Sequence, residues 1–507
     1  MPKINLEFYK NQDNNTYFPL NNLDENIIEL LKNPVNDIKV RDSRPEIYYY
    51  LLSPHIEDLF KWFDINPNSE ILEIHSGLGA STKTLCQKAK NVTTVNFSKT
   101  NAEIIEQRLK NCENLEIIVG NIKEIEFKKK FDYIILTDVI EFSRAFFHEI
   151  DFIKFFKNLL NEDGTIILTT TNKYAIENFS GAINHISAKP FDFVNNFPEV
   201  PFLKSFSKKE LTKIFTLAGF KNINFYYPVP NHYINAQILS DKYIESMAGR
   251  KVATKYHNYV INQNNTLDEI NAIKDLVQED MFSFFANSYI IFATNSKLNV
   301  PCYAQFKGDI LTVLNENCCT KKALNKEAEK ILFKMKEFYE TETKRIENQN
   351  IQNVKYAKCE LKNDSLVFEY AKGTPLNKIA LDLKGDYYKL LTFLTEFKEF
   401  IYKLYPDIQY SDFKVESLVL ENTGCIKNAN IDLNLGNIFK DDDCYTIIDY
   451  DKTSELVPIN YLIASAIFVL TVDSGFEIDD FKLLKDLGLS EREIKIYQLM
   501  YAKNIRG

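Results

Sequence analysis

The run of residues 70–79, EILEIHSGLG, has residue types and spacing that favour binding of a cofactor. It is typical of a strand, a turn of small residues and the start of a helix. Gly77 and Gly79 would let the backbone approach a ligand closely, and the first turn of a helix offers unpaired N–H groups to an anion. Two glycines after a strand can also form a plain turn. The neighbouring elements therefore decide between a cofactor site and a turn.

A second set of residues has the spacing that phosphoryl transfer needs. Asp432 is followed five residues later by Asn437, and Asp449 ends the next expected strand. In such sites one carboxylate orients the acceptor hydroxyl, while an amide and a second carboxylate hold magnesium ions. The competing interpretation is a plain hairpin whose turn is formed by the acidic residues 441–443.

The elements that would position the first set alternate between strands and helices. Short apolar runs predict strands and are separated by segments of helix length, which indicates a parallel sheet with crossover helices. Thr100 with Glu103, and Ser207 with Glu210, predict capping boxes at two helix starts. A later strand is expected to end at Pro228 and to pair with residues 288–294. The five earlier strands are expected at residues 70–74, 92–97, 115–119, 131–139 and 165–172.

The second half of the chain has a different pattern. Strands are expected near residues 310–315 and 365–370, helices over 324–339 and 390–404, and two short strands within 430–451. A polar stretch that ends in Pro301 separates the halves. We therefore predict an N-terminal extension (1–50), an α/β domain (51–296) and an α+β domain (297–507).

The first domain resembles the class I S-adenosylmethionine-dependent methyltransferases, a Rossmann-like family, over roughly residues 45 to 295. The resemblance is carried by the 70–79 run, Asn96, Gly120-Asn121, the run FDYIILTD that ends at Asp138, and NEDG at 161–164. More narrowly, Asn172-Lys173, FSGA at 179–182, FSKKEL at 206–211 and FYYP at 225–228 are similar to a bacterial subgroup found with surface-glycan biosynthesis proteins.

This resemblance implies S-adenosylmethionine as cofactor and assigns residues to its parts. Glu73, Gly77 and Gly79 would shape the methionine side, Asn96 would face the ribose hydroxyls and Asn121 would lie near the adenine. His75 stands in the same turn where the family has a glycine, and Asn96 stands where it has an acidic residue.

Methyl transfer gains mainly from holding the acceptor aligned, with a base added for a hydroxyl nucleophile. The candidate bases are Asp138, Glu141 and His185, each of which could instead be a cap, a surface charge or a satisfied loop residue. A dinucleotide dehydrogenase is the competing interpretation of the glycine-rich turn. It fits poorly, because Thr82 stands at the place of the third glycine and no acidic residue ends the second strand.

The second domain resembles the aminoglycoside and choline kinase-like proteins over roughly residues 300 to 465, with LVFEYAKG at 366–373 similar to their hinge. By that resemblance Asp432 is the catalytic aspartate, Asn437 and Asp449 are metal ligands, and Mg-ATP is a second candidate cofactor. Asn430 stands where the family has a histidine. The phosphate-binding lysine would be Lys321 or Lys322, with Glu327 or Glu329 as its helix partner.

Composition limits the class of protein. The 61 Lys and Arg against 70 Asp and Glu give a net charge of -9, which argues against a dedicated nucleic-acid binder. The eight cysteines form no C-x-x-C pair, so reduced thiols and a cytoplasmic location are expected. No apolar run reaches the length of about 18 residues that a membrane span needs.

We therefore expect a methyltransferase that modifies a sugar or other small group in cell-surface glycan biosynthesis, with a kinase-like domain that phosphorylates or positions the acceptor. The expected partners are a small-molecule or glycan acceptor and glycan-assembly proteins. The alternative is a non-catalytic scaffold in glycan assembly, in which both sites have lost activity. His75, Asn96 and Asn430 favour that alternative.

Overall fold

The computed structural model describes residues 1–10, 25–44, 47–183, 186–187, 189–246, 267–474 and 478–506. The described residues divide into two compact units. Unit 1 takes the residues up to Glu245 and those from 267 to Gln305, and unit 2 takes those from Phe306 onward. The predicted boundary between residues 296 and 297 lies close to this division. Within the described residues, every helix is too short or too polar to cross a bilayer.

Unit 1 is built on one mixed sheet with the strand order β1-β4-β3-β2-β5-β6-β9-β7-β8-β10. Strands from β1 to β6 pair in parallel, whereas β9 is antiparallel to both β6 and β7. The strands are β1 (Lys3–Asn5), β2 (Glu70–Ile74), β3 (Asn91–Asn96), β4 (Leu115–Val119), β5 (Phe131–Thr137), β6 (Leu160–Thr171), β7 (Asn222–Val229), β8 (Gln237–Ser240), β9 (Ser288–Thr294) and β10 (Tyr303–Lys307).

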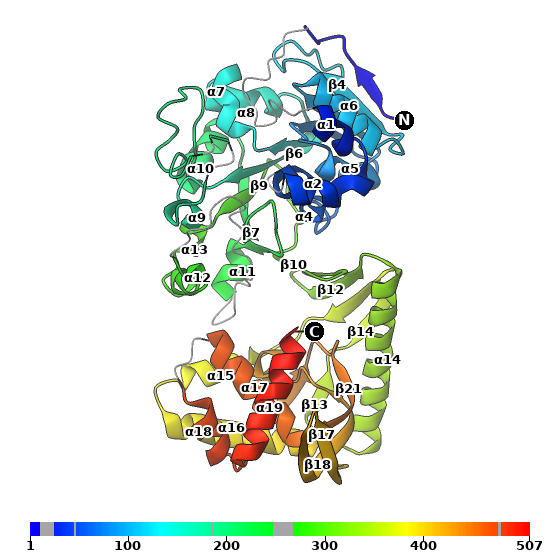
Figure 1. The fold of residues 1–507 in the computed structure, drawn as a ribbon, viewed down its shortest axis with the longest axis vertical. Coiled ribbons are helices and arrows are strands. Elements are labelled where there is room, and N and C mark those ends of the chain that lie inside the picture. The colour runs from blue at the N-terminus through cyan, green and yellow to red at the C-terminus, as the bar shows by residue number, and fades with distance from the viewer. Residues whose placement is uncertain are drawn as a thin grey trace. The chain divides into compact units, whose positions relative to one another are not determined.

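Helices cover both faces of this sheet, as expected for parallel strands with crossover connections. Figure 1 shows α4, α5 and α6 on one side and α7, α8 and α10 on the other. The helices are α1 (Glu25–Leu31), α2 (Asp37–Ser43), α4 (Pro54–Asp58), α5 (Ala80–Lys88), α6 (Lys99–Arg108), α7 (Ser143–Phe146), α8 (Glu149–Lys157), α9 (Ile176–Phe179), α10 (Lys208–Leu217), α11 (Asp241–Ser246), α12 (Glu269–Gln278) and α13 (Phe282–Phe285).

The described part of residues 1–50 is integrated into unit 1 and is not a separate extension. Strand β1 pairs in parallel with β4, and apolar residues of α1 and α2 pack against Leu78 and Ile104. Arg108 of α6 forms a two-pronged ion pair with Asp37, with nitrogen to oxygen distances of 2.8 and 2.9 Å. The first domain therefore begins before residue 51.

Several local predictions for unit 1 need correction. Helix α6 is capped by Ser98, whose Oγ accepts from the Asn101 N–H, and not by Thr100 with Glu103. Strand β7 continues through Pro228. Strand β9 pairs only with the residues of β7 that precede Pro228, so β9 needs no backbone N–H from the proline. The capping box of Ser207 and Glu210 is confirmed.

Unit 2 contains an antiparallel part of a sheet and two complete sheets. The first is in the order β11-β12-β15-β14, and the others have the orders β13-β20-β19-β16 and β17-β18-β21. The strands are β11 (Ile310–Leu314), β12 (Cys318–Ala323), β13 (Val354–Tyr356), β14 (Cys359–Lys362), β15 (Ser365–Glu369), β16 (Thr374–Pro375), β17 (Gln409–Val415), β18 (Leu418–Asn430), β19 (Ile438–Asp441), β20 (Cys444–Ile447) and β21 (Thr453–Pro458).

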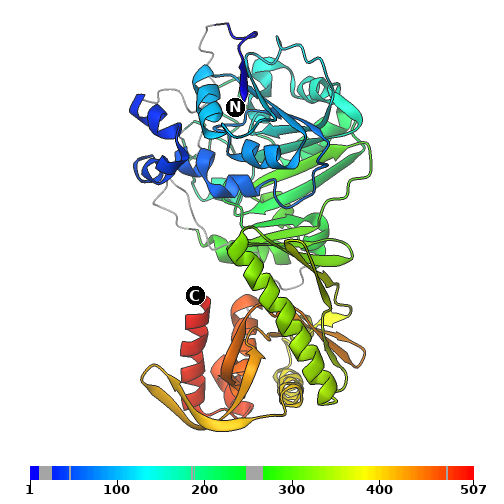
Figure 2. The same cartoon turned by 90° about the vertical axis from the view of Figure 1, so that its right-hand side faces the viewer.

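The helices of unit 2 share one apolar core with these sheets. Figure 2 shows the long α14 beside the first sheet and the extended hairpin of β17 and β18. The predicted helix over 324–339 is the first part of α14. The helices are α14 (Lys326–Asn348), α15 (Leu376–Asp382), α16 (Tyr387–Leu404), α17 (Ile459–Ser474), α18 (Asp480–Asp486) and α19 (Glu491–Arg506).

Candidate functional site

The turn that follows β2 is shaped by its backbone. His75, Gly77 and Gly79 all take positive φ angles, of 64°, 56° and 85°, and Gly79 caps α5. A Cβ at Gly77 would lie 3.1 Å from a methyl of Leu51, so both the backbone conformation and the space favour glycine there. The turn thus presents backbone, and the start of α5, at the carboxyl edge of the parallel strands.

His75 is tied to the neighbouring strand. Its Nδ1 lies 3.1 Å from the carbonyl oxygen of Thr137, to which an Nδ1–H can donate. Burial lowers the pKa of His75, and the ring is therefore neutral near pH 7. The imidazole that replaces the usual glycine is directed to the end of β5.

Glu73 acts on the turn indirectly. Its side chain is fully buried, and its two carboxylate oxygens accept hydrogen bonds from Ser81 Oγ at 2.8 Å and Thr82 Oγ1 at 2.7 Å. Both hydroxyls belong to the first turns of α5. Glu73 therefore fastens α5 to β2, and burial raises its pKa. A ligand would meet the turn that Glu73 holds, since both Glu73 oxygens are already bonded.

Asn96 and Asn121 follow the next two strands along the same edge. The amide of Asn96 is buried and donates to Ser76 Oγ at 2.9 Å, which joins the end of β3 to the turn. Asn121 is half-buried, and its Oδ1 accepts from the Lys123 N–H at 3.0 Å. The residues expected near methionine, ribose and adenine thus lie at the ends of the adjacent strands β2, β3 and β4.

Asp138, which directly follows β5, is the centre of a cluster that sequence reasoning only partly found. His232 Nε2 lies 2.9 and 3.0 Å from its two carboxylate oxygens, and the hydroxyl of Tyr233 donates to Oδ2 at 2.9 Å. His232 and Tyr233 come from the loop between β7 and β8. Because they stand more than ninety residues from Asp138 in the chain, no spacing in the sequence indicated the contact.

The two other candidate bases differ. Glu141 is buried, accepts a hydrogen bond from Thr170 Oγ1, and has no partner for Oε2 within the described residues. Burial, and then the charge of Asp138, raises the pKa of Glu141 to about 8. His185 lies outside the described residues.

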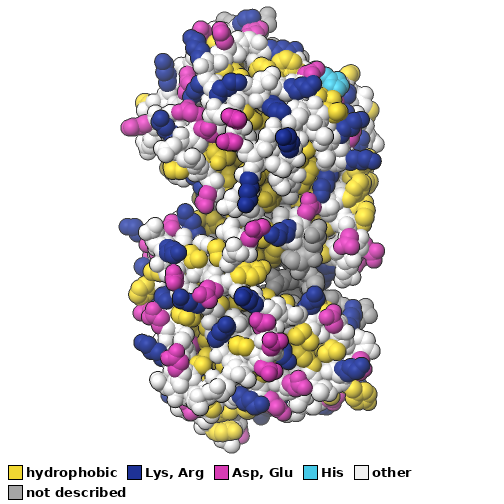
Figure 3. Space-filling model, turned by 180° about the vertical axis from the view of Figure 1, so that it is seen from behind, with side chains coloured by type: hydrophobic (Ala, Val, Ile, Leu, Met, Phe, Trp, Pro, Cys, Tyr) yellow, Lys and Arg dark blue, Asp and Glu magenta, His cyan; other side chains and the backbone are white. Residues whose placement is uncertain are grey.

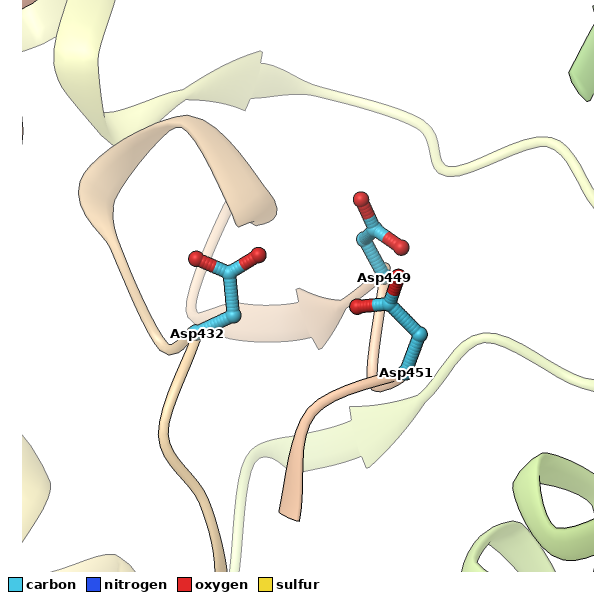
Figure 4. A group of neighbouring side chains, drawn as sticks. All are labelled: Asp432, Asp449 and Asp451. Atoms are coloured by element: carbon cyan, nitrogen blue, oxygen red, sulfur yellow. The ribbon is translucent and has the colours of Figure 1, made fainter. Parts of the chain in front are cut away.

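In unit 2 the predicted aspartates do come together. Carboxylate oxygens of Asp432, Asp449 and Asp451 lie within 4.8 Å of one another, and Figure 4 shows the three side chains around one space. Asp451 was missed by sequence reasoning, although the alternation Asp449-Tyr450-Asp451 was a usable signal. Three oxygen donors of this kind suit a divalent cation such as Mg²⁺.

A buried lysine completes this cluster. The ammonium of Lys321, on β12, forms an ion pair with Asp449 and lies 3.9 Å from Asp451, while Lys307 lies 3.3 Å from Asp451. Lys322 is exposed and pairs with Asp364, so of the two candidate lysines only Lys321 pairs with the aspartate cluster among the described residues. Glu327 and Glu329 are exposed on α14, where Glu327 pairs with Lys330.

Three asparagines shape the loop of Asp432. Asn430 Oδ1 accepts from the Asp432 N–H at 3.0 Å, Asn434 donates to its carboxylate at 3.1 Å, and Asn437 donates to its carbonyl oxygen at 2.9 Å. Asn437, which was predicted as a metal ligand, donates its amide to the loop of Asp432. Asn430 thus helps to position the backbone of Asp432.

Electrostatics differ between the aspartates. Burial, and then the neighbouring charge of Asp449, raises the pKa of Asp432. For Asp449 burial also raises the pKa, but the ammonium of Lys321 outweighs burial and leaves it lowered. Asp449 is thus ionised at neutral pH.

On the face drawn in Figure 3, basic and acidic side chains are interspersed.

Residues 72–168 match the protein family described as methyltransferase domain. The probable ribosomal RNA small subunit methyltransferase A of Methanosarcina acetivorans is 22% identical over 106 residues, covering 21% of this chain and 39% of that protein. The ubiquinone biosynthesis O-methyltransferase of Pelagibacter ubique is 26% identical over 163 residues, covering 32% and 58%. The chain thus spans less than two thirds of each relative's length.

Two solved methyltransferase structures have low similarity to this chain. A methyltransferase from Thermotoga maritima has 14% identity and a TM-score of 0.30, covering 53% of this chain and 100% of that one. Phosphoethanolamine N-methyltransferase 2 of Haemonchus contortus, solved with S-adenosyl-L-methionine, has 14% identity and a TM-score of 0.32, covering 52% and 58%.

Proposed function

We propose, from the match of residues 72–168 to a methyltransferase domain, that unit 1 binds S-adenosylmethionine and transfers its methyl group to a small acceptor. The observation that carries this proposal is the turn from His75 to Gly79, with its three positive φ angles at the carboxyl edge of the sheet. Such a turn lets a ligand approach the backbone, and the start of α5 offers N–H groups to a carboxylate.

The cofactor would supply an electrophilic methyl group, and the chain would hold both reactants. Gly77 and Gly79 would lie under the methionine part, while Asn96 and Ser76 would offer polar groups to the ribose. Asp138 stands on the neighbouring strand end, where an acceptor beside the methyl group would lie. In-line transfer gains most from this alignment.

We further propose a sugar or other small group in cell-surface glycan biosynthesis as the acceptor, with a cytoplasmic location. The support for this acceptor is the resemblance of Asn172-Lys173, FSKKEL at 206–211 and FYYP at 225–228 to the glycan-associated subgroup. Glycan-assembly proteins are the proposed partners.

Calorimetry with S-adenosylmethionine and S-adenosylhomocysteine tests the cofactor site. Gly77→Ala adds a Cβ at a φ of 56°, near Leu51, and should weaken both ligands by about tenfold or more. Gly308→Ala is a matched control, because Gly308 has a φ of 57° but open space around it and lies in unit 2. Equal binding by wild type and Gly77→Ala would place the site elsewhere.

A second candidate function belongs to unit 2: binding of a magnesium-nucleotide, with Asp432 orienting the acceptor of a phosphoryl group. The specific observation that favours it is the buried ammonium of Lys321 beside three carboxylates, since phosphoryl transfer needs both a cation for the phosphates and ligands for the metal. Asn437, Asp449 and Asp451 would hold the metal.

Lys321 and Lys322 give a matched pair of variants, because they are neighbours on β12 with opposite exposure. Lys321→Met should abolish Mg-ATP binding measured by calorimetry, whereas Lys322→Met should leave it unchanged. Asp432→Asn should keep binding and stop transfer. If neither unit binds its ligand, the non-catalytic scaffold is the better description.

A further inference from the structure

We propose that His232 and Tyr233 are positioning residues that hold Asp138 ionised beside the methyl group, so that Asp138 takes the proton of a hydroxyl or amine acceptor. This inference rests on the proposed binding of S-adenosylmethionine by unit 1. It assigns a role to two residues outside the family's glycine-rich turn, and it defines the acceptor by its chemistry.

The geometry gives Asp138 two buried hydrogen-bond donors. The side chain of His232 is 1% exposed and that of Asp138 is 13% exposed, so the carboxylate is the part of this cluster that an acceptor can reach. His232 Nε2 lies 2.9 and 3.0 Å from the two oxygens, and the Tyr233 hydroxyl lies 2.9 Å from Oδ2. Donors aimed at a carboxylate favour its ionised form.

Within the described residues, the imidazole of His232 forms hydrogen bonds only with Asp138. Its other nitrogen, Nδ1, is buried and has no hydrogen-bond partner among them. With its hydrogen on Nε2, the ring donates to Asp138 and leaves a lone pair, not an unpaired N–H, at the buried Nδ1. Burying an imidazole with one nitrogen unpartnered costs free energy, and the hydrogen bonds to Asp138 offset this cost.

The loop that carries the two donors is fixed by its own hydrogen bonds. Asn231 Oδ1 accepts from the Tyr233 and Ile234 N–H groups at 3.1 and 3.3 Å. The His232 N–H donates to Ser288 Oγ at 2.9 Å, and Asn235 donates to the His55 carbonyl at 2.8 Å. The donors are thus preorganised, and their positions do not depend on a bound ligand.

The position of Asp138 relates this cluster to the cofactor turn. Asp138 follows β5, which pairs with β2, and His75 of the turn bonds to Thr137, the residue before Asp138. Asp138 also has a positive φ, of 48°. This backbone conformation costs free energy for a residue other than glycine. The carboxylate is therefore held at the strand end next to the turn.

Methyl transfer forms one bond and breaks another. A lone pair of the acceptor oxygen or nitrogen forms the new bond to the methyl carbon, and the S–C bond breaks with its electron pair remaining on sulfur as a thioether. The acceptor proton passes to an oxygen of Asp138, which becomes a carboxylic acid and later loses the proton to water. Because Asp138 is anionic before transfer in this proposal, carboxylate and phosphate acceptors would be repelled.

Sinefungin tests this arrangement without knowledge of the acceptor. It carries a protonated amine where S-adenosylmethionine carries the transferable methyl, so its ammonium should meet Asp138. Wild type should bind sinefungin about tenfold more tightly than S-adenosylhomocysteine, because a charge-assisted hydrogen bond is gained. Asp138→Asn should remove this preference while leaving S-adenosylhomocysteine within about twofold.

The positioning residues are tested by the pH at which the sinefungin preference disappears. Tyr233→Phe and His232→Leu each remove a donor to ionised Asp138, so the pKa of Asp138 should rise. As the pH is lowered, these variants should lose the sinefungin preference at a higher pH than wild type does. His232→Gln, which can still donate, should restore most of it. Tyr289→Phe is the control, since its buried hydroxyl bonds to the Ser283 carbonyl instead.

Among the described residues, His75, Glu141, His232 and Tyr233 face Asp138, and each could contribute to the pH profile. An unchanged profile in both donor variants, or a sinefungin preference that survives Asp138→Asn, would overturn the inference. Failure of wild type to bind S-adenosylhomocysteine would instead overturn the cofactor site, and this inference with it.

Discussion

The candidate sites of the two units are held together by different means. In unit 1 the turn after β2 is a backbone structure, and the polar side chains around it, such as Glu73 and Asn96, are engaged in fastening that backbone. In unit 2 the site is an arrangement of opposite charges, in which Lys321 faces Asp449 and Asp451. The site in unit 1 therefore depends on the backbone conformation of the turn. The site in unit 2 depends on opposite charges that neutralise, or compensate, one another.

The largest effect that this comparison predicts is the loss of compensation in unit 2. Asp449→Asn leaves the ammonium of Lys321, which is 8% exposed, without its nearest counter-charge. Asp449 is 35% exposed and Asp451 remains 3.9 Å from the ammonium, so we expect the free energy of unfolding of unit 2 to fall by about 2 kcal/mol, less than for a fully buried pair. Hydrogen exchange of unit 2 peptides would measure the loss.

The single tryptophan, Trp62, lies in unit 1, so its fluorescence reports whether unit 1 is affected. Asp442→Asn is the control, because Asp442 is exposed in the turn between β19 and β20. A loss of stability as small as that of the control would mean that the charges of unit 2 do not compensate one another, which breaks the comparison.

An intermediate effect on stability is expected in unit 1, which buries the carboxyl group of Glu141. The pKa of Glu141 is raised by burial, and then by Asp138, to about 8. Folded Glu141 therefore keeps its proton at a pH where the unfolded chain loses it, and stability falls as the pH rises from about 4.5 to about 8. One proton gives a slope of at most about 1.4 kcal/mol per pH unit.

Glu141→Gln should remove this part of the slope, so that the variant gains stability relative to wild type as the pH rises. Urea unfolding at several pH values, followed by Trp62 fluorescence, measures it. Glu162→Gln, at an exposed position in β6, should leave the slope unchanged. A Glu141→Gln variant with the wild-type slope would show that this carboxyl is compensated in the folded state.

The smallest effect concerns the backbone of unit 1. Ser98→Ala removes the cap of α6 near the end of β3 and should cost about 1 kcal/mol, whereas Thr100→Ala should cost much less because Thr100 lies inside the helix. Thermal unfolding of the two variants decides between them. Equal losses would restore the capping box of Thr100 and Glu103 predicted from the sequence.

The sequence predicted what depends on adjacent residues. Strands β2 and β4 begin and end at the predicted residues, because apolar runs of that length form buried strands regardless of distant contacts. The cap of α6 was misplaced by two residues, since serine and threonine both cap helices and only the backbone conformation selects one.

Contacts between distant residues were not predictable. The pairing of His232 with Asp138 depends on how the β7–β8 loop passes over the end of β5, which no local pattern encodes. The choice between Lys321 and Lys322 was open for a related reason. Successive side chains of a strand point to opposite faces, and only the packing of β12 shows which face meets Asp449.

The N-terminal strand has a practical consequence for making the protein. Strand β1 covers the outer hydrogen-bonding edge of β4, and Phe8 lies so close to Gly120 that a Cβ there would be 2.7 Å from it. A protein shortened to begin at residue 51 would leave the N–H and C=O groups of β4 open to other chains. Unpaired strand edges of this kind promote aggregation, so the shortened protein should precipitate where the full chain remains dispersed.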